Sequence, residues 1–144
     1  MTEFLSTAVK ELLERGEVEK ANILLGFPYY MEGVVLHGNA IGGKFGYPTA
    51  NIIPPGFLPK PGVYKTVTRV GDKAYKGLTN VGSKPTFGID TPSVETTLLD
   101  FDGNLYGKFI KVEFLRYIRP LKKFKGGKEL GEQIKKDFIE AAKD

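Results

Sequence analysis

The sequence has no cysteine and a single histidine, His37. Without cysteine, the chain cannot form disulfides, use thiolate catalysis or bind a metal through thiolates. One histidine cannot build a multi-histidine metal site either. Any metal that this chain binds is therefore expected to be a hard ion held by oxygen atoms, such as Mg²⁺ or Ca²⁺.

Long hydrophobic runs are absent as well. No apolar stretch approaches the ~20 residues that a membrane-spanning helix needs. The N-terminal residues MTEFLSTAVKELLERG are amphipathic and acidic, unlike the basic and then apolar pattern of a secretory signal. We therefore expect no membrane partner and a cytoplasmic location.

The chain has 144 residues, of which 41% are hydrophobic and 26% are charged, as is typical of one soluble globular domain. Its formal net charge of +4 is unevenly placed, because residues 108–144 contain eleven Lys and Arg against six Asp and Glu. This surplus of positive charge is consistent with contact with nucleic acid or attraction of a phosphorylated small molecule. It is also consistent with a solvated helix face rich in lysine. Charge alone does not choose among them.

The two ends of the chain predict helices. Ser6 or Thr7 can cap a first helix that stops at Gly16, and a second helix is predicted over residues 17–25, with Gly26 at its end. Together they form a short N-terminal helical hairpin. A C-terminal helix, expected to pack across the rest of the domain, is predicted from an apolar stripe of Leu130, Ile134, Phe138, Ala141 and Ala142.

Between these helices the pattern is that of an antiparallel β domain, with short Val-, Ile-, Tyr-, Phe- and Thr-rich runs separated by Gly and Pro. The predicted strands are 31–36, 62–70, 74–80, 94–101 and 108–117, with a short one near 51–53. Residues 71–73 and 102–104 predict the turns of two hairpins.

A sheet of about six strands without covering βαβ units tends to close and so remove its edges. The predicted fold is therefore mainly β, a six-stranded antiparallel Greek-key barrel. The Pro- and Gly-rich stretch at 54–62 is too long for a tight turn and predicts a mobile loop, of a kind that often acts as a lid.

The segment GGKFGYPTANII, residues 42–53, combines backbone-permissive glycines with small polar side chains. Its glycines and Lys44 suit close contact with phosphate, although the Walker spacing is absent. Thr49 and Asn51 share one face of an extended segment, so they can offer two neutral oxygens to one cation, with substrate phosphates and water completing its shell. The alternative is a plain loop in which Thr and Asn are turn formers.

Glu95 is the second unusual feature, because it shares a strand face with Thr97, Leu99 and Phe101. A carboxylate beside large apolar residues has to be paired or functional if it is buried. Strand curvature that leaves it exposed, or a nearby lysine, is the structural alternative.

Further motifs occur in a fixed order: GGKFGYPTAN, PGVYKTVTRV, NVGSKPTFG, VETTLLDFDGNLYG and VEFLRYIRPLKKF, followed by ELGEQIKKD. With them, residues 27–144 resemble the riboflavin kinase (flavokinase) domain, found alone in eukaryotes and as the C-terminal half of bacterial bifunctional riboflavin kinase/FMN adenylyltransferases. Residues 1–26 resemble the segment that joins the two halves. The resemblance implies a helical linker at 1–26, a kinase domain at 27–144, and an N-terminal FMN adenylyltransferase domain as a partner in a longer parent protein.

The resemblance implies a riboflavin kinase-like barrel with a C-terminal helix, and an Mg²⁺-dependent enzyme that transfers the γ-phosphoryl group of ATP to riboflavin, giving FMN. Glu95 stands at the family's catalytic carboxylate, and Thr49 and Asn51 match the residues that hold Mg²⁺ with ATP. The implied nucleotide-binding residues are Gly38, Gly43, Lys44, Thr49, Asn51, Leu98 and Tyr106. The implied flavin-binding residues are Glu95, Arg119, Lys122 and Phe124.

Two positions depart from the family's pattern, because Thr97 replaces a usual histidine and Leu121 replaces a usual glutamate. Neither departure removes a catalytic group, so both concern local contacts such as substrate affinity or loop closure. The notable point is that Glu95, Thr49 and Asn51 are all present. The resemblance therefore favours an active kinase.

Two other function classes are weighed against a kinase. An idle flavin- or FMN-binding module would be expected to lose the carboxylate or the cation ligands. A nucleic-acid-binding barrel would be expected to interleave aromatic and basic residues on exposed strands. The alternation in the basic C-terminal region is better explained by Ile110, Val112 and Phe114 facing the core, so we expect no nucleic-acid partner.

Overall fold

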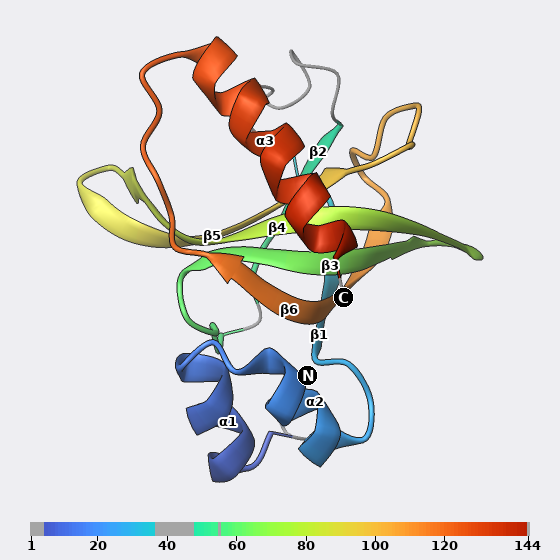
Figure 1. The fold of residues 1–144 in the computed structure, drawn as a ribbon, viewed down its shortest axis with the longest axis vertical. Helices are drawn as coiled ribbons and strands as arrows, with labels where there is room; N and C mark the ends of the chain where they lie inside the picture. The colour runs from blue at the N-terminus through green and yellow to red at the C-terminus, as the bar shows by residue number, and fades with distance from the viewer. Residues whose placement is uncertain (1–4, 37–47, 55, 144) are drawn as a thin grey trace.

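The computed structural model describes residues 5–36, 48–54 and 56–143, but not the side chains of residues 84–86. Figure 1 shows a curled β-sheet with two short helices below it and a longer helix across its upper face. The elements are α1 (Thr7–Glu14), α2 (Val18–Leu25), β1 (Tyr30–Val34), β2 (Thr49–Ile52), β3 (Gly62–Val70), β4 (Lys73–Thr86), β5 (Ile89–Leu98), β6 (Phe109–Arg119) and α3 (Gly127–Ala142).

The six strands form one antiparallel sheet in the order β1-β6-β3-β4-β5-β2. The sheet curls into a half-barrel, and among the described residues an isolated bridge between Leu36 and Asn51 joins its two edges. This confirms the predicted mainly β architecture with a C-terminal helix and an N-terminal helical hairpin.

One of the two predicted hairpins is confirmed and the other is wrong. β3 and β4 pair across the turn at 71–73. No hairpin forms at 102–104, because β5 pairs with β4 and β2 whereas β6 pairs with β3 and β1. The second hairpin turns instead at Phe87 and Gly88, whose φ angles of 52° and 77° suit the central residues of a type I′ turn.

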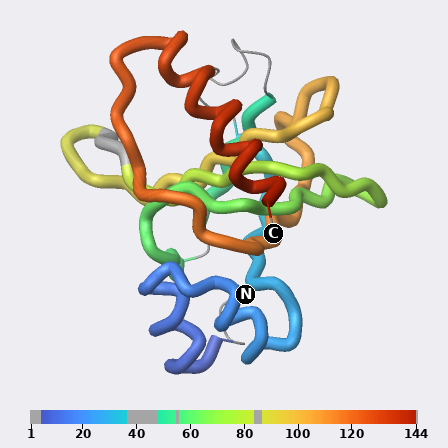
Figure 2. The backbone as a smooth tube through the Cα atoms, viewed as in Figure 1, coloured from blue at the N-terminus to red at the C-terminus, as the bar shows by residue number. Residues whose placement is uncertain are grey.

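This β4–β5 hairpin is longer than the sequence pattern predicts, and Figure 2 shows it extending away from the rest of the sheet. Pro85 and Pro92 both lie within its paired strands. Proline cannot donate a hydrogen bond to a neighbouring strand, so it usually marks a strand end. Because of these two prolines, the sequence pattern predicted strands that end before the tip of the β4–β5 hairpin.

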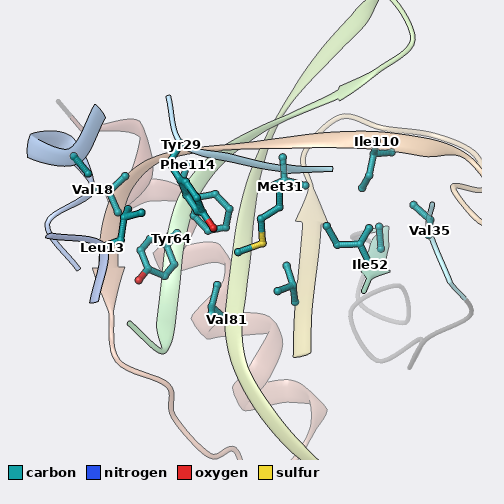
Figure 3. Packing of buried hydrophobic residues seen from close by; sticks show 14 of the residues in the cluster. Leu13, Val18, Tyr29, Met31, Val35, Ile52, Tyr64, Val81, Ile110 and Phe114 are labelled. Atoms are coloured by element: carbon teal, nitrogen blue, oxygen red, sulfur yellow. The ribbon is translucent and has the colours of Figure 1, made fainter. Parts of the chain in front are cut away.

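The main hydrophobic core lies on the face of the sheet toward α1 and α2. Figure 3 shows Leu13 and Val18 of the helices beside Tyr64 and Phe114 of the sheet, with Met31 further along. The predicted alternation of β6 is confirmed, since its inward residues are almost fully buried, namely Ile110, Val112 and Phe114.

The helical hairpin is tied to the sheet by Asn22, whose Nδ2 donates to the carbonyl of Phe114 and whose Oδ1 accepts from the backbone N–H of Tyr29, both at 2.8 Å. Its predicted caps are confirmed: Ser6 Oγ accepts a backbone N–H at 3.2 Å, and α2 ends at Gly26 with a φ of 80°. The division of the chain at residue 26 stays a prediction, although the hairpin shares the sheet's core.

The stretch at 54–62, predicted to be a mobile loop, contacts the rest of the domain in its described part. Phe57 and Leu58 pack against the core. The backbone N–H of Lys60 donates to the carbonyl of Leu13 in α1 at 2.9 Å. These contacts attach residues 57–60 to the core and to the helical hairpin, and the mobility of the stretch stays a prediction.

α3 crosses the other face of the sheet, here called the α3 face (Figure 1). As predicted, it packs across the β domain, through a cluster of Val63, Leu78, Ile134 and Ala141. Arg116 of β6 secures its C-terminal end, since Nη2 donates to the carbonyls of Glu140 at 2.8 Å and Lys143 at 3.0 Å. In the described part of the chain, no helix is both long and apolar enough to cross a membrane.

Candidate functional site

The strand register places five residues in one row across the α3 face. Asn51 of β2 lies opposite Glu95 of β5, and Glu95 lies opposite Asn80 of β4. The row continues through Val63 of β3 to Arg119 of β6. Directly opposite residues on antiparallel strands have Cβ atoms about 4.5–5.5 Å apart, so each side chain in the row can contact the next.

All five residues of the row line a cavity of about 330 Å³, here called the α3 cavity. α3 contributes apolar side chains and one acidic residue to its opposite wall: Leu130, Ile134 and Asp137. The segment 120–126, which runs from the end of β6 to the start of α3 (Figure 2), adds Leu121, Lys122 and Phe124. The α3 cavity is therefore polar near Glu95 and near the Arg119–Asp137 pair, and apolar along Leu130 and Ile134 of the helix.

Arg119 is held firmly by α3. Its Nε and Nη2 donate to the two carboxylate oxygens of Asp137 at 2.9 and 2.8 Å, and Asp137 is only 4% exposed. Gln133 adds a 2.9 Å hydrogen bond to the same carboxylate, and Arg119 Nη1 donates to the carbonyl of Pro120. A guanidinium has five N–H groups, so Arg119 still has donors that can reach into the cavity.

The other predicted flavin residues lie on the segment 120–126. The ring of Phe124 is half-buried, with the Arg119 guanidinium 6.0 Å and the Lys122 ammonium 5.8 Å from its centroid. Both cations are within range of a weak attraction to the ring. The structure therefore brings Glu95, Arg119, Lys122 and Phe124 to one cavity.

A second cavity of about 340 Å³ lies next to the first, here called the β2 cavity. Asn51 and Ser93 border both cavities. The rest of its lining is largely apolar and includes Leu36, Ile52 and Val94. Asn51 thus stands where the two cavities meet, and its cross-strand partner Glu95 lies in the α3 cavity.

The predicted nucleotide-binding residues are not all brought together. Gly38, Gly43 and Lys44 lie outside the described residues. Leu98 is fully buried in the main core, and Tyr106 lies in the loop after β5, where its backbone N–H donates to Asn104 Oδ1 at 2.9 Å. Neither of these two lines the α3 cavity or the β2 cavity.

Thr49 and Asn51 are the candidate metal ligands, and they belong to strand β2 and not to a loop. They point to one face of the strand, opposite Thr97 and Glu95. Across the described residues, no group of three or more acidic or histidine side chains could hold a metal ion. Two neutral oxygens fit Mg²⁺ only as part of a shell that phosphates and water complete, which is the arrangement expected of Mg²⁺ with a nucleotide.

The two departures from the family's pattern both touch the α3 cavity. Thr97 lies two residues after Glu95 on β5. It is buried, and it pairs with Leu78 of β4. Leu121 lies over Gly82 so closely that a Cβ added at Gly82 would be 2.7 Å from Leu121 Cδ1. A leucine at position 121 therefore packs on the cavity rim where a glutamate would place a charge.

Two residues of the site were missed from the sequence, Asn80 and Asp137. Asp137 carried a usable signal, because it falls on the apolar stripe of α3 between Ile134 and Ala141. A charge on the buried face of a helix needs a partner. Asn80 carried only the weaker signal of an asparagine inside a predicted strand, since asparagine is depleted in strands.

The chain is a small antiparallel β domain with two adjacent cavities, and solved structures share its fold. A chain described as a macrolide-efflux protein from Streptococcus pneumoniae superposes with a TM-score of 0.88 and 32% identity, covering 98% of this chain and 47% of that one. Riboflavin kinase from Trypanosoma brucei superposes with a TM-score of 0.51 and 27% identity, covering 79% of this chain and 74% of that one.

The family described as flavokinase, riboflavin kinase, matches residues 25–144. The bifunctional riboflavin kinase/FMN adenylyltransferase of Bacillus subtilis is 43% identical over 146 aligned positions, which cover 94% of this chain and 45% of that protein. The chain therefore belongs to the riboflavin kinase family. It spans less than half the length of this bifunctional relative.

Proposed function

We propose that this domain is a riboflavin kinase, which transfers the γ-phosphoryl group of ATP to the terminal ribityl hydroxyl of riboflavin and gives FMN and ADP. The observation that carries the proposal is the pairing of Glu95, in the α3 cavity, with Asn51, which borders both cavities. A cation ligand and a general base are needed side by side in phosphoryl transfer, because the nucleophile is deprotonated where the phosphate is held.

The two cavities suit two substrates. The α3 cavity has an apolar, aromatic end at Val63, Leu130 and Phe124 and a polar end at Glu95, which fits a flat ring that bears a polyol chain. The β2 cavity is lined by Asn51 and by its bridge partner Leu36, the residue that leads into the glycine-rich segment. We assign riboflavin to the first and ATP to the second, with the γ-phosphate at their border.

In this arrangement Glu95 accepts the proton of the terminal hydroxyl as its oxygen attacks the γ-phosphorus. The bond from that phosphorus to the bridging oxygen breaks, and its electron pair leaves with ADP. A positioned general base contributes about 10²- to 10⁴-fold in rate. Thr49 and Asn51 would hold Mg²⁺, which when bound neutralises charge on the ATP phosphates.

An assay with riboflavin, ATP and Mg²⁺, read by chromatography, tests the proposal, and FMN formed in proportion to protein concentration is the expected result. Omission of ATP is the control. Riboflavin binding, followed by quenching of flavin fluorescence, should accompany turnover. Binding without any FMN after a long incubation would instead favour the alternative, an idle flavin-binding module.

One wider proposal follows from the relatives and not from the site. The bacterial relatives are described as bifunctional, so we propose that this domain works beside an FMN adenylyltransferase domain in a longer protein. A cytoplasmic location and the absence of a nucleic-acid partner stay predictions.

A further inference from the structure

Asn80 occupies the middle of the residue row and has no assigned role. It lies directly between Glu95 of β5 and Val63 of β3, and it lines the α3 cavity. Its side chain is exposed to that cavity and makes no hydrogen bond to any residue that the structure describes. The carboxamide thus offers one acceptor and two donor hydrogens to a ligand.

Neither strand formation nor packing explains an asparagine at this position. Asparagine is depleted in strands because its side chain packs poorly on a pleated surface and competes for the backbone. Its same-face neighbours on β4 are Leu78, which packs on α3, and Gly82, which lies under Leu121. A polar side chain between these two is expected where the cavity receives a polar group.

We infer that Asn80 positions the acceptor substrate, by hydrogen-bonding a hydroxyl of the polyol chain one or two carbons from the hydroxyl that Glu95 deprotonates. The inference rests on the proposed function and adds to it a residue that recognises the chain and not the ring. The order of the row supports it, because Asn80 stands between the carboxylate of Glu95 and the apolar side chain of Val63, which itself precedes Arg119.

The same order predicts which part of the substrate each position contacts. The phosphate is next to Asn51, the terminal hydroxyl next to Glu95, and the remainder of the chain crosses Asn80. The ring then lies between Val63 and the apolar residues of α3. Asn80 is therefore a specificity determinant for a polyol chain, distinct from the aromatic contact at Phe124.

Two flavins that share a ring separate this role from a structural one. Riboflavin has the ribityl chain, whereas lumiflavin has a methyl group in its place. Binding of each to the Asn80→Ala protein is measured by quenching of flavin fluorescence. Because one neutral hydrogen bond is lost, we expect the riboflavin Kd to rise about 3- to 10-fold while the lumiflavin Kd stays within about twofold of wild type.

Two further variants keep the test decisive. Asn80→Val favours the strand, so it preserves folding, and its apolar side chain cannot replace the hydrogen bond of the carboxamide; the same selective loss is expected. Lys76→Ala is the matched control, because Lys76 is exposed on the same face of β4 but lines neither cavity. Its affinities for both flavins should equal those of wild type.

The outcomes also separate this inference from the proposed function. If wild type forms no FMN, the proposed function fails, whatever Asn80 does. If wild type forms FMN and the Asn80 variants weaken both flavins equally, or neither, the inference is overturned and the kinase assignment stands. A selective loss for riboflavin, with a lower kcat/KM for its phosphorylation, supports the inference.

Discussion

Asn51 and Glu95 are direct partners in the β2–β5 ladder; Glu95 lines the α3 cavity, and Asn51 lines both cavities. Side chains alternate between the faces of a strand, so a shift of one residue in this register would send Asn51 to the opposite face from Glu95. β2 has only four residues. The pairing of one short edge strand therefore decides whether the proposed cation ligand and base meet.

Glu95→Gln tests the base directly, because the amide keeps the size of the side chain but cannot take a proton at neutral pH. We expect kcat to fall by about 10²-fold or more, with little change in substrate affinity or melting temperature. Single-turnover FMN formation and thermal unfolding of the same variant provide the two measurements.

Glu113→Gln is the matched control for that experiment. Glu113 is also a strand glutamate, but it is 9% exposed and paired with Arg69 Nε at 2.9 Å, away from the α3 cavity. Its loss should lower stability by about 1 kcal/mol, since Arg69 is half exposed, and leave kcat near wild type. An intact rate in a stable Glu95→Gln protein would remove Glu95 from the mechanism.

Thr49→Ala and Asn51→Ala should weaken the use of Mg²⁺ and ATP while riboflavin binding stays nearly intact. The reason is that their oxygens are assigned to the cation, whereas the flavin is assigned to the α3 cavity. A titration of activity with Mg²⁺, beside quenching of flavin fluorescence, separates the two effects. Asn51→Asp keeps an oxygen in place and should retain more Mg²⁺-dependent activity than Asn51→Ala. Unchanged Mg²⁺ dependence in both alanine variants would contradict the assignment.

Replacement of Tyr29 and of Tyr64 by phenylalanine should have different effects on the stability of the fold. Both are buried in the core, but the Tyr64 hydroxyl donates to the carbonyl of Lys60 while the Tyr29 hydroxyl has no hydrogen-bond partner among the described residues. Tyr64→Phe should cost about 1 kcal/mol of unfolding free energy, and Tyr29→Phe should be neutral or slightly stabilising. Urea unfolding of the two variants makes the comparison, and equal losses would contradict it.

The same tyrosines give the stability of the fold a pH dependence. Burial raises the pKa of Tyr29 and of Tyr64 above the ordinary tyrosine value of about 10. Above that pH the unfolded chain loses these protons while the folded chain keeps them, so stability falls as pH rises. Tyr29→Phe should make this alkaline loss smaller, and urea unfolding at pH 8 and at about pH 11 tests it.

Local signals predicted the local structure well. The cap at Ser6, the stop at Gly26 and the bounds of β3 at Gly62–Val70 agree with the sequence pattern, because capping groups and strand alternation act over a few residues. The partner of β6 did not follow from such signals. The Asp-Gly pair at 102–103 marks a turn in the chain, but it does not determine which strands pair on either side of it.

In the site, too, single residues could be predicted from the sequence, whereas their arrangement could not. Thr49, Asn51 and Glu95 could be selected from residue type and strand spacing, but their meeting depends on the β2–β5 register. Asn80 joins them only because β4 is the other neighbour of β5. Asp137 depends on how α3 crosses the sheet, which is a packing outcome that no short stretch of sequence encodes.

Asp137→Asn tests whether the ion pair to Arg119 keeps α3 and the segment 120–126 over the α3 cavity, the proposed riboflavin site. The pair is nearly buried, with side-chain exposures of 5% for Asp137 and 20% for Arg119. The amide leaves the guanidinium without its counter-charge, so we expect a loss of about 2 kcal/mol in stability, less than for a fully buried pair, and weaker riboflavin binding.

Glu140→Gln supplies the control from the same helix, one turn further on. Its carboxylate lies near Arg116 and Lys143, at 3.8 and 3.3 Å, but it is 47% exposed, so its removal should cost no more than about 0.5 kcal/mol and leave riboflavin affinity unchanged. Calorimetric unfolding and flavin quenching of both variants decide the matter. If the two variants behave alike, the buried pair does not position the cavity wall, and closure of the site has to come from apolar packing at Ile134 and Leu130.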